Sequence, residues 1–214
     1  MTNARNAAGQ ARKRPGPSGD PDVRDGILDA AEDLFATRGF AATSIREIAD
    51  RVKVNPAMVH YYFGSKKKLL RTVMERVLEP LAGALANVEA QAQLPVRELT
   101  SLMFAMAADH PCLPQLITRE VLLPGGELQA EFLGHFAPRL GGRLPGMLRR
   151  EQREGRLAAD FDPQIMALLV LSLCVFPFIA RPAAEAVLDG RYDHDGLQAL
   201  SEHVAGLLER GLRR

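Results

Sequence analysis

The sequence predicts an all-α protein, on three observations. Apolar residues recur every three or four positions along most of the chain, and no segment sustains the alternation of a β-strand. Asn-Pro and Asp-Pro pairs precede several of these segments, and such pairs are typical of helix starts. Finally, a chain of 214 residues with 47% hydrophobic content can bury the core of one large or two small domains.

The first helix is predicted to begin at Asp20-Pro21, because aspartate caps helix N-termini and proline fits the first helical position. Ile27, Ala31, Leu34 and Phe35 form its apolar stripe, which ends at Gly39.

The segment 43–63 reads as two short helices joined by a tight turn. Ser44 and Glu47 have the spacing of a capping box, and Asn55-Pro56 marks the second helix start. An apolar stripe of the first helix comprises Ile45, Ile48, Ala49 and Val52. Only Lys53 to Asn55 separate the helices, which is the spacing of a helix-turn-helix, whose second helix enters the major groove of DNA.

The second helix of this pair has an outward face suited to a duplex. With Val54, Val59 and Phe63 inward, the outward residues are Pro56, Ala57, Met58, His60, Tyr61 and Tyr62. Small residues permit close approach to base edges, and the ring nitrogens and hydroxyls can donate to bases or phosphates. Ser65 then caps a helix beginning with Lys66, Lys67 and Lys68, whose free N–H groups and cations favour a phosphate. The alternative is a solvated face beside an aromatic patch packed on neighbouring helices.

Residues 24–70 resemble the DNA-binding domain of the TetR/AcrR family of bacterial transcriptional regulators. The motif TSIREIADRV, followed by VNPAMVHYYFGSKKKL, carries the resemblance, together with Ala30-Ala31, Leu34-Phe35 and Gly39-Phe40. It implies DNA contacts from Thr43, Ser44, Arg46, Lys53, Asn55, Pro56, Ala57, Met58, His60, Tyr61, Tyr62 and Lys66. Two positions depart from the family pattern, since Lys53 stands where glycine is usual and His60 where tyrosine is usual. A positive φ at Lys53 would cost about 1 kcal/mol relative to glycine, unless the turn has another geometry.

Charge is divided unevenly along the chain. The net charge is only +1, but residues 1–76 hold 14 basic against 9 acidic residues, and all five lysines lie within the first 68 positions. The N-terminal third is therefore the part expected to bind double-stranded DNA through its positive charge.

Residues 1–20 are polar and basic, without the apolar run of a signal peptide. We predict that they form a disordered tail, with incidental DNA contact as the alternative. The predicted domains are this tail, a DNA-binding domain at 21–66 and a helical domain at 67–214.

The remainder of the chain predicts further helices only. A connecting helix is expected from Ser65 to about Gln91, bent near Pro80, with others starting near Pro95, Pro114 and Glu127. The helix from Glu127 should run to Gly155 with breaks at Pro138 and Gly141-Gly142. Asp162-Pro163 should cap a helix that ends by Arg181-Pro182, and a last one spans about 195–210. The apolar run 165–180 is too short to span a membrane and contains Pro177, so we expect a core or a subunit interface.

Signatures of enzymes are lacking: no nucleophile elbow, zinc-protease motif, phosphate loop or dinucleotide fingerprint occurs. The five histidines do not cluster, so neither a metal site nor a cofactor is expected. Cys112 and Cys174 are expected to be reduced core thiols, and the predicted location is the cytoplasm, with no membrane association.

The family resemblance implies a homodimer formed by the last two helices, 165–179 and 197–212, and a small-molecule pocket in the second domain. Candidate pocket residues are Met103, Phe104, Met106, Arg119, Phe132, His135, Phe136, Met166 and Phe176, with Phe178 beside them; an ordinary apolar core is the alternative. We therefore predict a homodimeric repressor that leaves a near-palindromic operator on binding a hydrophobic or amphiphilic ligand. A regulator of the same fold controlled by a protein partner, or by no ligand, is the rival hypothesis.

Overall fold

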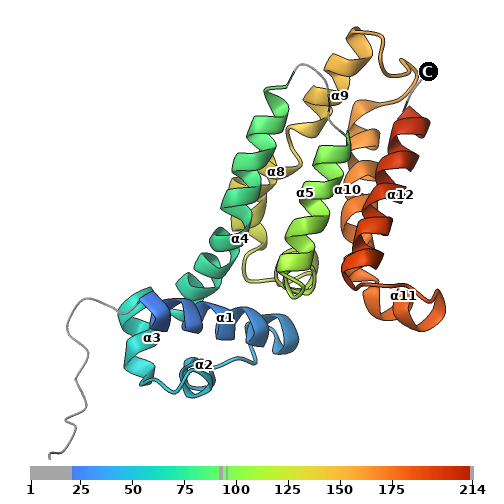
Figure 1. The fold of residues 1–214 in the computed structure, drawn as a ribbon. Helices are drawn as coiled ribbons and strands as arrows, with labels where there is room; N and C mark the ends of the chain where they lie inside the picture. The colour runs from blue at the N-terminus through green and yellow to red at the C-terminus, as the bar shows by residue number, and fades with distance from the viewer. Residues whose placement is uncertain (1–20, 92–93, 95, 213–214) are drawn as a thin grey trace, which may run out of the picture.

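The computed structural model describes residues 21–91, 94 and 96–212, and the predicted tail lies outside them. Every regular element in this described part is helical, which confirms the all-α prediction (Figure 1). The N-terminal helices are α1 (Pro21–Arg38), α2 (Ile45–Arg51) and α3 (Pro56–Phe63), and the long α4 (Lys66–Glu89) leads away from them. As predicted, α4 contains Pro80 and starts at a Ser65 cap.

The C-terminal domain surrounds the second half of α4. Its elements are α5 (Val96–Asp109), α6 (Leu113–Ile117), η1 (Thr118–Leu122), α7 (Gln129–Glu131), η2 (Phe132–Phe136), α8 (Ala137–Leu140), α9 (Leu144–Arg153), α10 (Pro163–Ile179), α11 (Arg181–Val187) and α12 (His194–Leu212). The segments η1 and η2 are single turns of π-helix. In Figure 1, α5, α10 and α12 stand side by side in the C-terminal domain.

One predicted helix break differs from the structure. The chain stays helical through Pro138, because this proline lies in the first turn of α8, where a missing N–H costs little. The prediction that the helix starting at Asp162-Pro163 ends by Arg181-Pro182 is confirmed, since α10 ends at Ile179, and a further short helix, α11, begins at Arg181. The predicted break at Gly141-Gly142 is confirmed, since α8 ends there and α9 starts at Leu144.

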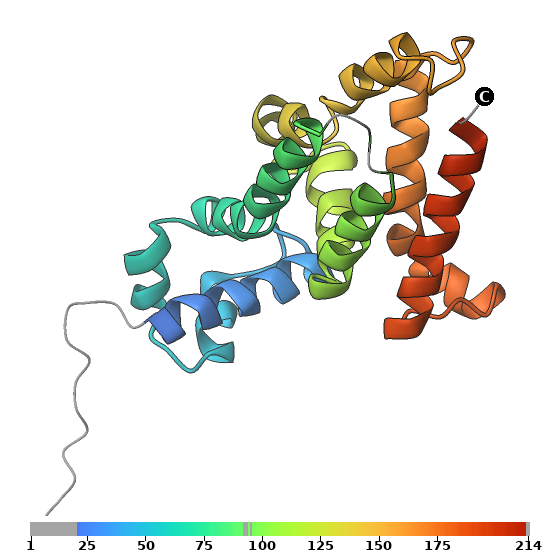
Figure 2. The same cartoon turned by 45° about the horizontal axis from the view of Figure 1, so that its top comes forward.

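The apolar core consists of two clusters, and their division does not follow the predicted domain boundary. The first joins α1, α2, α3 and the first half of α4 to side chains of α6, η1 and η2, including Leu116, Val121 and Phe136. The second joins the end of α4 to α5, α9, α10 and α12. Figure 2 shows the corresponding arrangement, with α1 lying along the first half of α4 and ending beside the C-terminal domain. Packing of the N-terminal helices thus continues into the C-terminal domain.

None of the described helices is by itself long and apolar enough to cross a membrane; only α10 and α11 taken together, which bend by 69° at their junction, have the length and composition.

Candidate nucleic-acid interface

The start of α2 is held by the predicted capping box. The Ser44 hydroxyl accepts the Glu47 N–H at 3.2 Å, and the Glu47 carboxylate accepts the Ser44 N–H at 2.8 Å. This backbone hydrogen bond, together with that from the Ser44 hydroxyl, lowers the pKa of Glu47. Ser44 is exposed at this end of α2. Hydrogen bonds between residues close in sequence therefore fix the residue at which α2 begins.

The turn between α2 and α3 contains a left-handed residue, which is one of the two geometries that the sequence leaves open. Lys53 has φ of 57°, and the following N–H of Val54 donates to the Ala49 carbonyl at 3.0 Å. The Asn55 side chain then accepts the Ala57 N–H at 2.9 Å, with Pro56 at the first helical position. Lysine is strained here relative to glycine, but it adds an exposed cation beside the reading helix.

The outward face of α3 is largely as predicted. Val59 and Phe63 are buried, whereas Ala57, His60 and Tyr61 are exposed. His60 Nδ1 lies 3.1 Å from the Gly64 carbonyl, which orients its ring. Three residues of the predicted face are less available. Pro56 and Met58 are half-buried, and Tyr62 packs partly against the first core cluster.

Thr43 and Lys66 point into the protein and hold the loop between α1 and α2. The Thr43 side chain is only 1% exposed, and its hydroxyl donates to the carbonyls of Leu34 and Gly39. The Lys66 ammonium donates to the carbonyls of Phe40 and Thr43 at 2.7 and 2.8 Å and lies 4.2 Å from the Phe40 ring centroid. Two of its three donors are thus used internally, which leaves one for the predicted phosphate.

Other cations near α3 are more open to a duplex. The Arg46 side chain is 85% exposed, with Asp50 at 3.9 Å, and Lys68 is exposed at the start of α4. Lys67 pairs with Glu127 at 2.7 Å, so its charge is partly balanced within the protein. The exposed set Arg46, Lys53 and Lys68 flanks the reading helix, where cations attract phosphates.

The structure does not bring the nine candidate pocket residues into one cavity. Met103, Phe104 and Met166 are buried together in the second core cluster, whereas Phe136 and the partly buried Phe132 belong to the first, and Met106 contacts both. Phe176 is 63% exposed on α10.

The two polar candidates are engaged elsewhere. Arg119 donates to the Ala36 carbonyl at the end of α1, at 3.2 Å. His135 lies 3.4 Å from Glu79 and 3.2 Å from Arg139. Both residues therefore connect segments of the fold rather than orient a ligand in the core.

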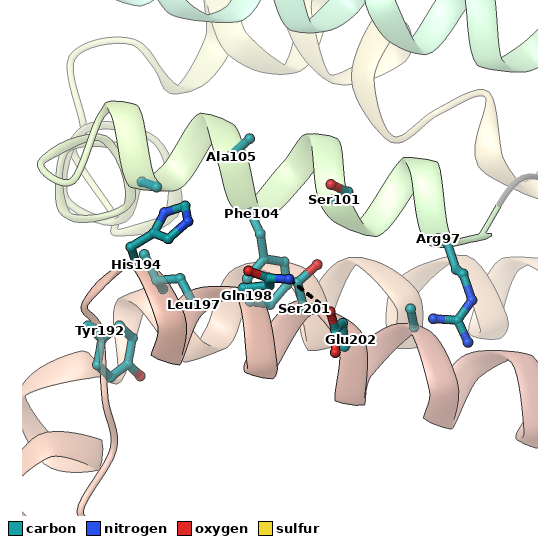
Figure 3. Close-up of a pocket in the computed structure, with 12 residues that line it drawn as sticks. Arg97, Ser101, Phe104, Ala105, Tyr192, His194, Leu197, Gln198, Ser201 and Glu202 are labelled. Atoms are coloured by element: carbon teal, nitrogen blue, oxygen red, sulfur yellow. Dashed lines mark hydrogen bonds between the residues drawn. The ribbon is translucent and has the colours of Figure 1, made fainter.

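A cleft of about 660 Å³ lies instead between α5 and α12, and Phe104 is the candidate that lines it. Figure 3 shows Arg97 and His194 at its opposite ends, with Gln198 and Glu202 hydrogen-bonded at 3.1 Å between them. Arg97 pairs with Glu209 at 2.8 Å. The cleft offers an apolar wall and a few polar groups, which is the usual make-up of a small-molecule site.

A sequence signal for this cleft exists, but it is recognisable only once the helix pairing is known. Small residues recur at helical spacing on both helices, namely Ser101, Ala105 and Ala108 on α5 and Ser201 and Ala205 on α12. Small side chains facing one another leave a gap between two helices. The pairing of α5 with α12 was needed to recognise it, and these segments are about a hundred residues apart.

Both domains match models of known protein families. Residues 27–73 match the family model of bacterial regulatory proteins of the tetR family, and residues 94–211 match that of the tetracyclin repressor-like C-terminal domain. The HTH-type transcriptional repressor NicS of Pseudomonas putida is 30% identical over 204 residues, which is 90% of this chain and 93% of NicS. The chain belongs to the TetR family. As a TetR-family protein it is a DNA-binding transcriptional regulator.

Solved structures of TetR-family fold agree with this assignment. The ketosteroid transcriptional regulator KstR2 of Mycobacterium tuberculosis superposes with a TM-score of 0.73 at 16% identity, covering 94% of this chain and all (100%) of KstR2. The fatty acid degradation regulator FadR of Bacillus halodurans gives a TM-score of 0.69 at 20% identity, covering 94% of this chain and 100% of FadR. At these identities the likeness concerns the fold.

Proposed function

We propose that this TetR-family protein is a homodimeric repressor that binds a near-palindromic operator and leaves it when a small, mainly apolar molecule occupies the C-terminal domain. The observation that carries the proposal is the first core cluster, which packs α1 to α4 continuously against α6, η1 and η2. Because protein interiors are close-packed, a shift on one side of such a cluster displaces the other. A ligand in the C-terminal domain can thereby change the separation of the two reading helices in a dimer.

The proposed dimer surface is the outward face of α10 with part of α12. Ile165, Leu168, Leu169 and Phe176 on α10 are each more than half exposed, and Leu207 on α12 is 53% exposed. A contiguous apolar surface of this kind is typical of a subunit interface. Two copies joined there would present two α3 helices to one duplex, which explains the expected twofold symmetry of the operator.

The proposed effector site is the cleft between α5 and α12, with Phe104 as the apolar contact shared with the sequence prediction. The names of the structurally similar KstR2 and FadR concern steroid and fatty-acid metabolism, which supports an apolar or amphiphilic effector. The proposed place of action is the cytoplasm, where bacterial DNA is found, and the proposed role is regulation rather than catalysis.

Selection of bound duplexes from a random pool provides the first test. The recovered sequence is expected to be near-palindromic, and ultracentrifugation should show a protein dimer bound to it. Its affinity is then measured against a panel of sterols, fatty acids and aromatic acids. Release by one compound, abolished by Ala105→Trp, which fills the cleft, supports the proposal. If a compound bound tightly in the C-terminal domain without changing operator affinity, regulation by a partner or without ligand would replace it.

A further inference from the structure

The main-chain groups of Phe40 are held by charged side chains from two different parts of the protein. Its N–H donates to the Glu120 carboxylate of η1 at 2.9 Å, and its carbonyl accepts from the Lys66 ammonium at 2.7 Å. Phe40 lies in the loop between α1 and α2, three residues before Thr43, which precedes the Ser44 cap. A shift of this residue therefore displaces the start of α2 and, through the turn, α3.

Glu120 is buried, and its carboxylate accepts backbone hydrogen bonds from two separate segments. The residue is only 5% exposed, and besides the Phe40 N–H its carboxylate accepts the Glu127 N–H at 3.3 Å. The Glu120 carbonyl accepts the Leu128 N–H at 3.1 Å, so the following turn folds back onto it. Gly126 makes this possible, because a Cβ there would lie 2.4 Å from the Glu120 main chain. Burying a carboxylate without hydrogen-bond partners costs free energy, so Glu120 favours the backbone arrangement that supplies these N–H groups.

Arg119, the neighbour of Glu120, binds the C-terminal end of α1. Its guanidinium donates to the Ala36 carbonyl at 3.2 Å, where the last carbonyls of a helix favour a cation. Gly39, with φ of 87°, lets the Arg119 stem approach, since a Cβ there would lie 3.0 Å from Arg119 Cδ. Arg119 thus binds the Ala36 carbonyl, before the end of α1, and the adjacent Glu120 binds the Phe40 N–H, after it.

The segment that carries both residues is wound as a π-helix. The Leu123 N–H donates to the Thr118 carbonyl, five residues back, at 3.0 Å. A π-turn holds one residue more than an α-turn, and such turns occur frequently at functional sites. Rewinding to an α-helix would rotate residues beyond the turn by about 100°, which would separate Glu120 and the turn at Gly126 from their present partners.

We propose that η1 is the element by which the C-terminal domain holds the DNA-binding domain in its operator-binding orientation, with Glu120 as the positioning residue. The N-terminal helices continue covalently into α4, which packs along α1, and the other end of α1 packs against α6 and lies beside η1 (Figure 1). Of the contacts made by the C-terminal domain, the hydrogen bond from the Phe40 N–H to Glu120 reaches the loop that leads to α2. The inference rests on the proposed function in using an operator duplex.

The test compares Glu120 with a matched buried carboxylate remote from the DNA-binding domain. Glu151 is also 5% exposed, and it likewise accepts a backbone N–H, that of Leu94, at 3.0 Å. The variants are Glu120→Ala, the milder Glu120→Gln, and Glu151→Ala as control. Glu120→Gln keeps one acceptor oxygen and serves where the alanine variant does not fold.

Three readouts decide the outcome. In the free protein, hydrogen exchange at the Phe40 amide should accelerate in both Glu120 variants and not in Glu151→Ala. Affinity for the selected operator should fall on the order of tenfold in Glu120→Ala, with partial recovery in Glu120→Gln and no change in the control. Operator binding should slow exchange over residues 118–128 in the unmodified protein and not in Glu120→Ala.

Folded Glu120 variants with unchanged operator affinity would overturn the inference, as would an equal loss in Glu151→Ala. Failure of the unmodified protein to bind any duplex would instead contradict the proposed function, and the exchange rate of Phe40 in the free protein would still decide whether Glu120 positions the loop. Operator binding that no compound relieves would remove the ligand switch and leave the role of Glu120 intact.

Discussion

Lys66 has a role in the structure other than the one that its motif predicts. The motif predicts a phosphate contact, whereas the structure uses two of its donors on carbonyls 23 and 26 positions earlier in the chain. Those carbonyls, of Phe40 and Thr43, lie in the loop that begins α2. The lysine therefore organises the DNA-binding domain from within.

We expect Lys66→Ala to lower the free energy of unfolding by roughly 1–3 kcal/mol, because charge-assisted hydrogen bonds to two part-buried carbonyls are lost. Lys68→Ala, at an exposed position two residues on, should leave stability unchanged but reduce the salt slope of duplex binding by about one unit. Urea unfolding and duplex affinity across salt concentrations measure the two effects. Equal stability of both variants would contradict this division.

Residues whose conformation depends on their immediate neighbours could be predicted from the sequence. The capping box at Ser44, the Asn55-Pro56 start and the Asp162 cap are all present, since each is decided within three or four positions. The positive φ of Lys53 is one of two geometries that the sequence leaves open. The partners of Lys66, Glu120 and Arg119 could not be predicted, because they lie 23 to 83 residues away in the chain.

At the scale of elements, α3 combines a reading face with a packing face. His60 is exposed, whereas Tyr62 is half-buried against the first core cluster. We expect His60→Ala to relax the base preference at one operator position, by roughly 1–3 kcal/mol if a base contact is lost. Tyr62→Ala should mainly lower thermal stability. Repeating the duplex selection with each folded variant measures the preference, and an unaltered preference for His60→Ala would mean that His60 contacts no base.

The link between α4 and α8 is expected to make stability depend on acid pH. Glu79 forms a double ion pair with Arg139 at 2.6 Å, and these hydrogen bonds are the main reason that the pKa of Glu79 is lowered to about 2. Because the folded-state pKa lies below the unfolded value, the contribution is present above about pH 4.5 and is lost as the pH falls towards 2. The sign is therefore destabilisation on acidification.

Removing either partner should flatten this part of the profile. For Glu79→Gln and Arg139→Ala, the free energy of unfolding should change less between pH 4.5 and pH 2 than in the unmodified protein. Chemical unfolding at a series of pH values measures the difference. A slope identical in all three proteins would show that the pair does not contribute.

The π-turns mark a limit of prediction at the element scale. The sequence predicts helix around Thr118–Leu122 and Phe132–Phe136, and both segments are helical. Local periodicity does not distinguish this wider winding from an α-helix, and Glu120 and Phe136 within these segments contact parts of the chain that are distant in sequence.

At the scale of the whole molecule, the exposed apolar face of α10 predicts the oligomeric state. Ile165→Asp places a charge on that face, where the native side chain is 60% exposed, and should convert the dimer to a monomer. Leu133→Asp is the matched control, because Leu133 is also 60% exposed but belongs to η2, which packs mainly against α7 and α8. Sedimentation velocity distinguishes the two, and a dimer retained by Ile165→Asp would place the interface elsewhere.

The cleft proposed as the ligand site could be predicted least well. Aromatic and methionine residues indicate an apolar interior, but whether they fill it or line a space depends on how helices from distant parts of the chain approach. In the structure Phe104 both packs in the second cluster and borders the cleft, whereas Phe132 and Phe136 pack in the first. The residues that leave the space open are small ones, such as Ala105 and Ala205.

The core that crosses the domain boundary limits how this protein can be recombined with its relatives. A chimera joined at residue 66 would give the foreign C-terminal half the task of covering Ile27, Phe35 and Phe63, which here pack in a cluster completed by Leu113, Leu116, Val121, Leu128 and Phe136. Cavities or clashes at that seam would lower stability, as in any core whose volume is altered. Transplanting the operator preference intact therefore requires exchanging residues 21–78 together with 113–136, two pieces separated by α5. The unit that evolution can shuffle is larger than the unit that touches DNA.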